Sequence, residues 1–217
     1  MQQFSDLAIT PLVLSALKKL NLIKPTPIQT LSIPMALDGK DLLGTAQTGT
    51  GKTYAFGIPL VNHLTLNKDS CALILTPTRE LALQVLKALQ DLTSNKNNLD
   101  SALIIGGDSI QKQLRQLKRA RLVVGTPGRM QDHLRRKSLK LNKFDFLVLD
   151  ETDRMLDMGF VDEIKSIIEK LPTHQTLLFS ATLPKKIADI AKKFMVDPQR
   201  VNVCLLYTSD AADELCR

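Results

Sequence analysis

The sequence predicts an α/β fold, with a mostly parallel sheet and helices on both of its faces. Short apolar runs of strand length alternate with segments of helical periodicity along most of the chain. The runs over 71–76 and 144–149 are the clearest, and nearly continuous apolarity is typical of central strands covered on both faces. Polar or glycine-rich residues follow most of these runs. In such sheets, ligands bind beyond the carboxyl ends of the strands.

Two helices are expected before the first strand. Thr10-Pro11 and Thr26-Pro27 each pair an N-cap residue with a proline suited to the first helical turn. The second of these helices carries Gln29 in its first turn. A primary amide suits the edge of adenine, although the spacing alone favours a solvent-exposed glutamine.

The next stretch predicts a phosphate-binding loop. A strand over 41–45 and a helix from 54 enclose eight residues: Ala46, Gln47, Thr48, Gly49, Thr50, Gly51, Lys52 and Thr53. The glycines let backbone N–H groups converge on an anion, and the following helix adds its own N–H groups and dipole. Lys52 can reach the β- and γ-phosphates, and the Thr53 hydroxyl can ligate Mg²⁺. Ala46 stands where the strict pattern has glycine. A chance turn is the competing interpretation, which the flanking strand and helix disfavour.

The remaining elements continue the alternation. Strands are expected over 71–76, 101–105, 121–125, 144–149, 175–179 and 201–203, and helices over 77–93, from 108 or 109 onward, and over 127–136, 159–171 and 184–195. Six polar segments then lie at one edge of the sheet: 46–53, 77–81, 106–107, 126–129, 150–153 and 180–182. Core packing alone does not explain six such segments at one edge.

Two carboxylates, Asp150 and Glu151, directly follow an apolar strand. Carboxylates at this point need solvation, a cation or a partner, because burying a lone charge is costly. Beside a phosphate loop, we expect Asp150 to hold Mg²⁺ and Glu151 to orient and deprotonate the attacking water. The alternative is an acidic strand end that merely caps a helix from about Thr152.

Length and composition restrict the class of protein. The 217 residues are enough for one α/β domain with its own core. No apolar run approaches the roughly 18–20 residues of a membrane-spanning helix, and the first residues lack the features of a secretory signal. Three cysteines without metal-ligand spacing favour a reduced, cytoplasmic protein without zinc. The net charge of +7 weakly favours a polyanionic partner.

Taken together, these motifs resemble the N-terminal, RecA-like domain of the DEAD-box RNA helicases, which use ATP to remodel RNA and RNA–protein complexes. The matching residues occur in the order of the family and cover about residues 4–203: Phe4, PTPIQ at 25–29, AQTGTGKT at 46–53, PTREL at 77–81, Gly106-Gly107, TPGR at 126–129, DETD at 150–153 and SAT at 180–182. The stretch RMLDMGF over 154–160 is most similar to bacterial members.

The resemblance implies a role for each matched position. Gln29 would contact the adenine of ATP, Phe4 would buttress that pocket, and residues 46–53 would hold the phosphates and Mg²⁺. The residues implied to contact the RNA backbone, without reading its bases, are Thr78, Arg79, Gly107, Thr126 and Arg129. Asp153, Ser180 and Thr182 would couple the ATP site to RNA binding. The alternative for Arg129 is a structural surface arginine.

The sequence also departs from the family pattern. Thr152 replaces the alanine of the family name, with little functional loss expected. Leu22 occupies the position of an aromatic residue and cannot stack on adenine. The family has a second RecA-like domain that completes the ATP site with arginines, and nothing after Val203 resembles it. We therefore expect this chain alone to be a monomer that binds nucleotide weakly, hydrolyses it poorly and does not unwind RNA.

Residues 1–204 are expected to form the helicase domain. Residues 205–217 do not continue the family pattern, which favours foreign sequence over a natural short tail. One alternative function is a non-catalytic nucleotide- or RNA-binding module that acts by docking to partners, and the intact Lys52, Asp150 and Glu151 argue against it. Another phosphate-loop ATPase is disfavoured by PTPIQ at 25–29 together with SAT at 180–182.

Overall fold

The computed structural model describes residues 3–93 and 99–203 of the chain. A 3₁₀ turn over Phe4–Asp6 (η1) precedes the helices α1 (Pro11–Lys19), α2 (Pro27–Leu37), α3 (Lys52–Leu66), α4 (Arg79–Leu92), α5 (Ile110–Leu117), α6 (Pro127–Arg135), α7 (Thr152–Asp157), α8 (Val161–Ile168) and α9 (Lys185–Phe194). The strands are β1 (Leu42–Ala46), β2 (Cys71–Leu75), β3 (Ser101–Ile104), β4 (Leu122–Gly125), β5 (Phe144–Leu149), β6 (Gln175–Ser180) and β7 (Gln199–Val203).

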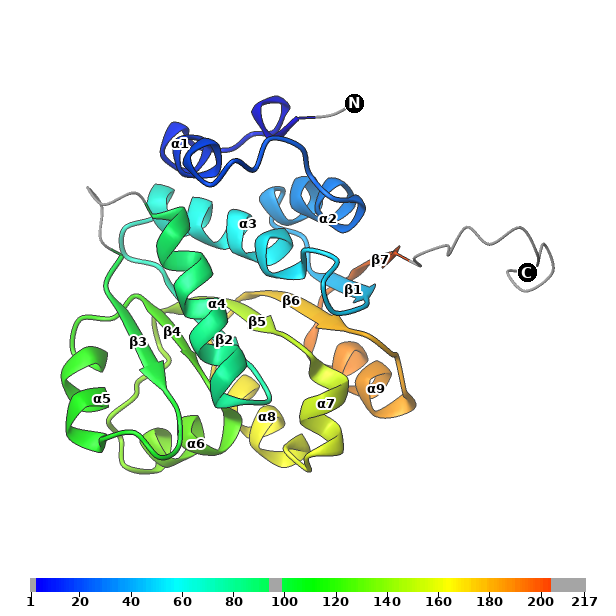
Figure 1. Ribbon diagram of the computed structural model, residues 1–217. Coiled ribbons are helices and arrows are strands. Elements are labelled where there is room, and N and C mark those ends of the chain that lie inside the picture. The colour runs from blue at the N-terminus through cyan, green and yellow to red at the C-terminus, as the bar shows by residue number, and fades with distance from the viewer. Residues whose placement is uncertain (1–2, 94–98, 204–217) are drawn as a thin grey trace.

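The strands form one sheet in the order β3-β4-β2-β5-β6-β1-β7, and each neighbouring pair is parallel. Helices α1 to α4 pack against one face, while α6 to α9 pack against the other (Figure 1). This confirms the predicted α/β class and the sheet with helices on both faces. The N-terminal helices α1 and α2 lie over α3 and extend the first layer.

The nearly continuous apolar strands follow from this layered arrangement. In β5, Phe146 and Val148 point into the core beneath α1 to α4, and Leu147 and Leu149 point into the core on the opposite face. Both faces of β5 are therefore buried. A strand of this kind needs apolar residues at successive positions, which explains the pattern visible in the sequence.

Several predicted helix starts are confirmed in detail. The Thr78 hydroxyl accepts a hydrogen bond from the Leu81 N–H (3.2 Å) at the start of α4. Ser109, rather than Asp108, is the N-cap of α5, and its hydroxyl accepts from the Lys112 N–H (3.4 Å). In α2, the Thr26 N–H donates to the Gln29 side-chain oxygen (2.9 Å), which is one of the two bonds of a capping box.

One helix differs from the prediction. The helix expected over 159–171 is found as α8, which covers only Val161–Ile168, and it is preceded by the short helix α7, which the sequence offered only as an alternative from about Thr152. Gly159 separates them with a left-handed backbone (φ 86°). The Gly159 and Phe160 N–H groups bond to the carbonyls of Leu156 and Met155, both at 3.0 Å, which is the Schellman ending of a helix.

Within the described part of the chain, no helix has the length and apolarity needed to cross a membrane. The predicted tail over 205–217 lies outside the described residues, so its expected nature stays a prediction.

Candidate functional site

The strand order divides the loops at the carboxyl edge of the sheet into two groups. Strands β5, β6 and β1 are neighbours, so the segments that follow them, 150–153, 181–182 and 47–51, lie close together. Strands β3, β4 and β2 form the other half, and the segments 106–107, 126–129 and 76–78 follow them. Strand β2 pairs with β5, so the two groups are adjacent.

The phosphate loop runs from the end of β1 to the start of α3. Gln47, Thr48 and Gly49 are exposed, and Gly49 and Gly51 both have positive φ (86° and 94°). Lys52 begins α3 and is buried, with its ammonium donating to the Ala46 carbonyl (3.0 Å). The bond between Lys52 and Ala46 thus joins the two ends of the loop. The exposed turn between them lies at the N-terminus of α3, a geometry suited to binding a phosphate group.

Gln29 is tied directly to this loop. Its side-chain amide donates to the Gly51 carbonyl (3.0 Å), and its carbonyl oxygen accepts from the Thr26 N–H (2.9 Å). A Cβ at Gly51 would lie 2.5 Å from the Gln29 amide nitrogen, so glycine is required for this contact. Gln29 is only 4% exposed, which excludes the solvent-exposed alternative. Its contact with adenine stays a prediction.

Phe4 is 3% exposed and belongs to the apolar core beneath the N-terminal helices. Its ring therefore has a packing role in η1, near the segment before α2, since its N–H lies 3.5 Å from the Ile23 carbonyl. This position is compatible with buttressing the region around Gln29, and a direct contact with a nucleotide stays untested.

Asp150 is the most strongly perturbed acid of the site. It is 3% exposed, and its burial raises its pKa to about 6, with Lys52 acting in the opposite direction and Glu151 raising the pKa further. One carboxylate oxygen accepts from the Glu151 N–H (3.0 Å). A buried carboxylate that is costly to ionise gains from a nearby cation, so the residue fits the predicted Mg²⁺ role.

Glu151 has a left-handed backbone (φ 50°, ψ 51°), which is strained for a residue with a side chain. Its side chain is 15% exposed and forms an ion pair with the exposed Arg154 (3.3 Å). The turn brings two successive carboxylates to the same edge of the sheet, where one is buried and the other remains accessible.

A hydrogen-bond network links the strand ends of β5 and β6. One Asp153 carboxylate oxygen accepts from the Ala181 N–H (3.1 Å), the Thr182 N–H (3.0 Å) and the Thr182 hydroxyl (3.1 Å), while the Asp153 N–H donates to the Ser180 hydroxyl (3.1 Å). Partial burial acts to raise the pKa of Asp153, but the bonds with Ser180, Arg154 and Thr182 outweigh it and lower the pKa. The structure thus brings together the three predicted coupling residues.

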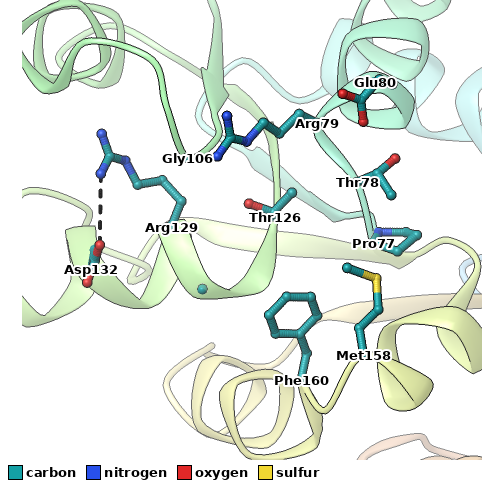
Figure 2. A pocket seen from close by; sticks show the side chains of 11 residues that line it. Pro77, Thr78, Arg79, Glu80, Gly106, Thr126, Arg129, Asp132, Met158 and Phe160 are labelled. Carbon is teal, nitrogen blue, oxygen red and sulfur yellow. Dashed lines mark ion pairs between the residues drawn. The ribbon is translucent and has the colours of Figure 1, made fainter.

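The second group of loops surrounds an open hollow of about 560 Å³ (Figure 2). Its lining residues are Pro77, Thr78, Arg79, Glu80, Gly106, Thr126, Gly128, Arg129, Asp132, Met158 and Phe160. The helices α4 and α6 both start here, so two helix N-termini face the same region. A polar side carrying Arg79 and Thr126 lies opposite an apolar side formed by Met158 and Phe160.

The two predicted RNA-binding arginines differ in their surroundings. Arg79 is exposed, and the structure gives its guanidinium no hydrogen bond or ion pair with the described residues. It lies against Gly107, where any side chain would collide with it. The Arg129 side chain is only 14% exposed and points toward Asp132, 3.9 Å away (Figure 2). Its Nε donates to Gln113 (3.1 Å) and its Nη2 to the Asp108 carbonyl (2.9 Å).

Sequence reasoning did not single out four residues of this region: Gln113, His133, Met158 and Phe160. Gln113 and His133 are both buried, and the side-chain oxygen of Gln113 accepts hydrogen bonds from Arg129 and from His133. Met158 is 48% exposed and lines the hollow. The stretch RMLDMGF at 154–160 was interpreted only as similar to bacterial members of the family, and Phe160 as an apolar position of the helix predicted over 159–171, so neither interpretation indicated a surface at the hollow.

The chain belongs to the DEAD/DEAH box helicase family, whose model matches residues 26–190. It is 45% identical over 203 residues to the ATP-dependent RNA helicase DeaD of Buchnera aphidicola subsp. Schizaphis graminum, with 92% of this chain and 34% of that protein covered. It is also 45% identical over 206 residues to the DEAD-box ATP-dependent RNA helicase CshA of Bacillus cereus, with 94% and 39% covered.

The fold is shared with solved structures of the family. A DEAD box protein from the hyperthermophile Methanococcus jannaschii superimposes with a TM-score of 0.89 at 41% identity, covering 93% of this chain and 56% of that one. The fold and the order of the motifs are those of the N-terminal, RecA-like ATP-binding domain of DEAD-box helicases. The chain spans 34% to 43% of the length of the curated relatives compared.

Proposed function

We propose that this chain binds ATP and Mg²⁺ at the loops that follow β1, β5 and β6, and supplies half of the catalytic site of an RNA-dependent ATPase. The observation that supports this most is the assembly at one sheet edge of a phosphate loop with Lys52, a buried acid at Asp150 and a second acid at Glu151. The relatives named above are ATP-dependent RNA helicases, which agrees with this function.

Each residue then has a chemical task. Lys52 and the N–H groups of the loop would bind the β- and γ-phosphates, and Thr53 with Asp150 would hold Mg²⁺, in part through water. Mg²⁺ would neutralise charge that develops on the phosphates. The Glu151 carboxylate would accept a proton from the attacking water. Gln29 would contact adenine from its position against Gly51.

We further propose that the hollow between α4 and α6 binds the backbone of RNA. Helix N-termini, the hydroxyls of Thr78 and Thr126 and the exposed Arg79 are groups that bind phosphate without reading bases. The Asp153 network belongs to the ATP half and follows β5, the strand that pairs with β2 of the other half, so it would offer a route for coupling at the boundary. A second RecA-like domain would complete both sites, and without it we expect little ATP turnover and no unwinding.

The assignment of Glu151 is tested by substitution. Glu151→Gln should retain ATP binding, because the phosphate loop is untouched, and should abolish turnover measured with single-stranded RNA and a separately made second RecA-like domain. Arg154→Met is the matched control, since it removes the ion-pair partner of Glu151 but leaves the carboxylate. Turnover should survive in the control. If Glu151→Gln hydrolyses ATP at the wild-type rate, Glu151 does not act on the water.

A further inference from the structure

A fully buried carboxamide lies behind the hollow. Gln113 is on α5, an otherwise basic and largely exposed helix, yet it is 0% exposed. Its amide nitrogen donates to the carbonyl of Ile105 (2.8 Å), the residue directly before Gly106-Gly107. A buried polar side chain is costly unless its groups are paired, so its partners define its role.

The carbonyl oxygen of Gln113 accepts from two side chains of α6. Arg129 Nε lies 3.1 Å away, and His133 Nε2 lies 2.9 Å away. A guanidinium can only donate, so this Gln113 atom is the acceptor and His133 must carry its proton on Nε2. Burial lowers the pKa of His133, and the charge of Arg129 acts in the same direction, which keeps the ring neutral near pH 7. We call Gln113, Arg129 and His133 the Gln113 network.

The same network holds the loop after β3 at both of its ends. Gln113 bonds to the Ile105 carbonyl at the start of the loop, and Arg129 Nη2 bonds to the Asp108 carbonyl at its end (2.9 Å). Between these points lies Gly107, whose left-handed backbone and missing side chain leave room for Arg79. Gln113 is therefore the residue that bonds both to the start of this loop and to the side chains of α6.

We propose that Gln113 is a positioning residue for RNA binding. It fixes the loop 106–108 against the N-terminal turn of α6, so that these two segments and Arg79 present one phosphate-binding surface. Arg129 uses two of its three nitrogens inside the protein, and it acts mainly through this arrangement rather than as a freely extended phosphate ligand. This inference rests on the proposed binding of RNA at the hollow.

The test is the variant Gln113→Met, which keeps the length of the side chain and removes its hydrogen bonds. With a labelled single-stranded RNA at low salt, the dissociation constant should rise about tenfold, and the slope of log K against log salt should become shallower by about 0.7 for each lost phosphate contact. ATP affinity should stay at the wild-type value, because the phosphate loop lies in the other half of the edge.

Gln116→Met is the matched control. Gln116 lies one turn further along α5 and accepts a hydrogen bond from the Leu103 N–H of β3 (3.3 Å), but it has no bond to α6. The variant Gln116→Met should weaken the contact between α5 and β3, and it should leave the slope of log K against log salt unchanged. In an Arg129→Ala background, Gln113→Met should add less than about a twofold change, because residues of one network do not contribute additively.

The possible outcomes separate the two proposals. If wild-type protein binds RNA but Gln113→Met and Gln116→Met change the RNA dissociation constant and the salt slope equally, Gln113 is not a positioning residue. The same conclusion follows if the effects of Gln113→Met and Arg129→Ala on RNA binding are fully additive. If wild-type protein does not bind RNA, the proposed function of the hollow fails and this inference fails with it. If Gln113→Met does not fold, Gln113→Glu replaces it, since a carboxylate still accepts from α6 but cannot donate to Ile105. RNA binding by that variant at the wild-type level would overturn the proposal.

Discussion

At the scale of single residues, Asp150 combines a proposed role in Mg²⁺ binding with a cost in stability. A carboxyl pKa raised from 3.8 to about 6 means that the folded state binds more protons than the unfolded state between these pH values. The contribution of Asp150 to the free energy of unfolding is therefore most favourable below pH 4, where its carboxyl is protonated. This contribution is lost as the pH rises through 6 and the carboxyl ionises in the folded state. Above pH 6, the charged form costs the folded protein on the order of 2–3 kcal/mol.

Asp150→Asn should therefore raise the free energy of unfolding at pH 7.5 by about 2 kcal/mol without Mg²⁺. The difference between the variant and wild type should shrink as pH falls from 6 to 4, because wild-type Asp150 becomes protonated. Urea unfolding with a chelator present, repeated across this pH range, measures both effects. A variant that is less stable than wild type at pH 7.5 would show that Asp150 is stabilised in its charged form.

Thr152, the departure from the family name, also has a structural role. Its side chain is 0% exposed, and its hydroxyl lies 3.3 Å from the Leu149 carbonyl and 3.2 Å from the Phe179 carbonyl. The hydroxyl therefore joins the ends of β5 and β6. Thr152→Ala should lower the free energy of unfolding by about 1 kcal/mol, the usual value of one buried hydrogen bond. A urea midpoint equal to that of wild type would contradict this role.

At the scale of elements, the break between α7 and α8 shapes the hollow. Gly159 ends α7 with φ 86°, and the turn places Met158 and Phe160 on the apolar side. A Cβ at Gly159 would meet no heavy atom within 4 Å, so only backbone strain opposes a side chain there. Gly159→Ala should cost about 1 kcal/mol of stability.

Gly128 supplies the comparison for this prediction. It lies in α6 on the same hollow without positive φ, and a Cβ there would contact the Phe160 ring at an ordinary 3.8 Å. Gly128→Ala should leave thermal stability unchanged or raise it slightly, because alanine favours helix. Equal losses of stability in the two variants would argue against backbone strain as the cause at Gly159.

The strand ends could be predicted from the sequence, whereas the buried face of α5 could not. The positions of Lys52, Asp150 and Thr182 followed from strand ends, because parallel strands bring their carboxyl ends to one edge. Gln113 could not be recognised, since a glutamine on a basic helix has the same sequence pattern whether it is exposed or buried. The helix boundary at Gly159 was expected, but the helix α7 before it was not, because six residues are too few to show a helical period.

At the scale of the whole molecule, the two groups of loops occupy adjacent halves of one sheet edge, and the hydrogen bonds of Asp153 tie the strand ends of β5 and β6 together beside the boundary. In the proposed function, this arrangement would place a nucleotide and an RNA strand side by side without completing either site. We therefore propose that the chain is a competent half of an enzyme and that a second RecA-like domain with its arginines is needed for turnover.

The most direct measurement is ATP hydrolysis by the wild-type chain, alone and mixed with a separately made second RecA-like domain from a bacterial DEAD-box protein, each with and without single-stranded RNA. We expect negligible turnover by the chain alone, and turnover that rises only when both RNA and the second domain are present. RNA-stimulated turnover by the chain alone, or no ATP binding under any of these conditions, would contradict the proposal.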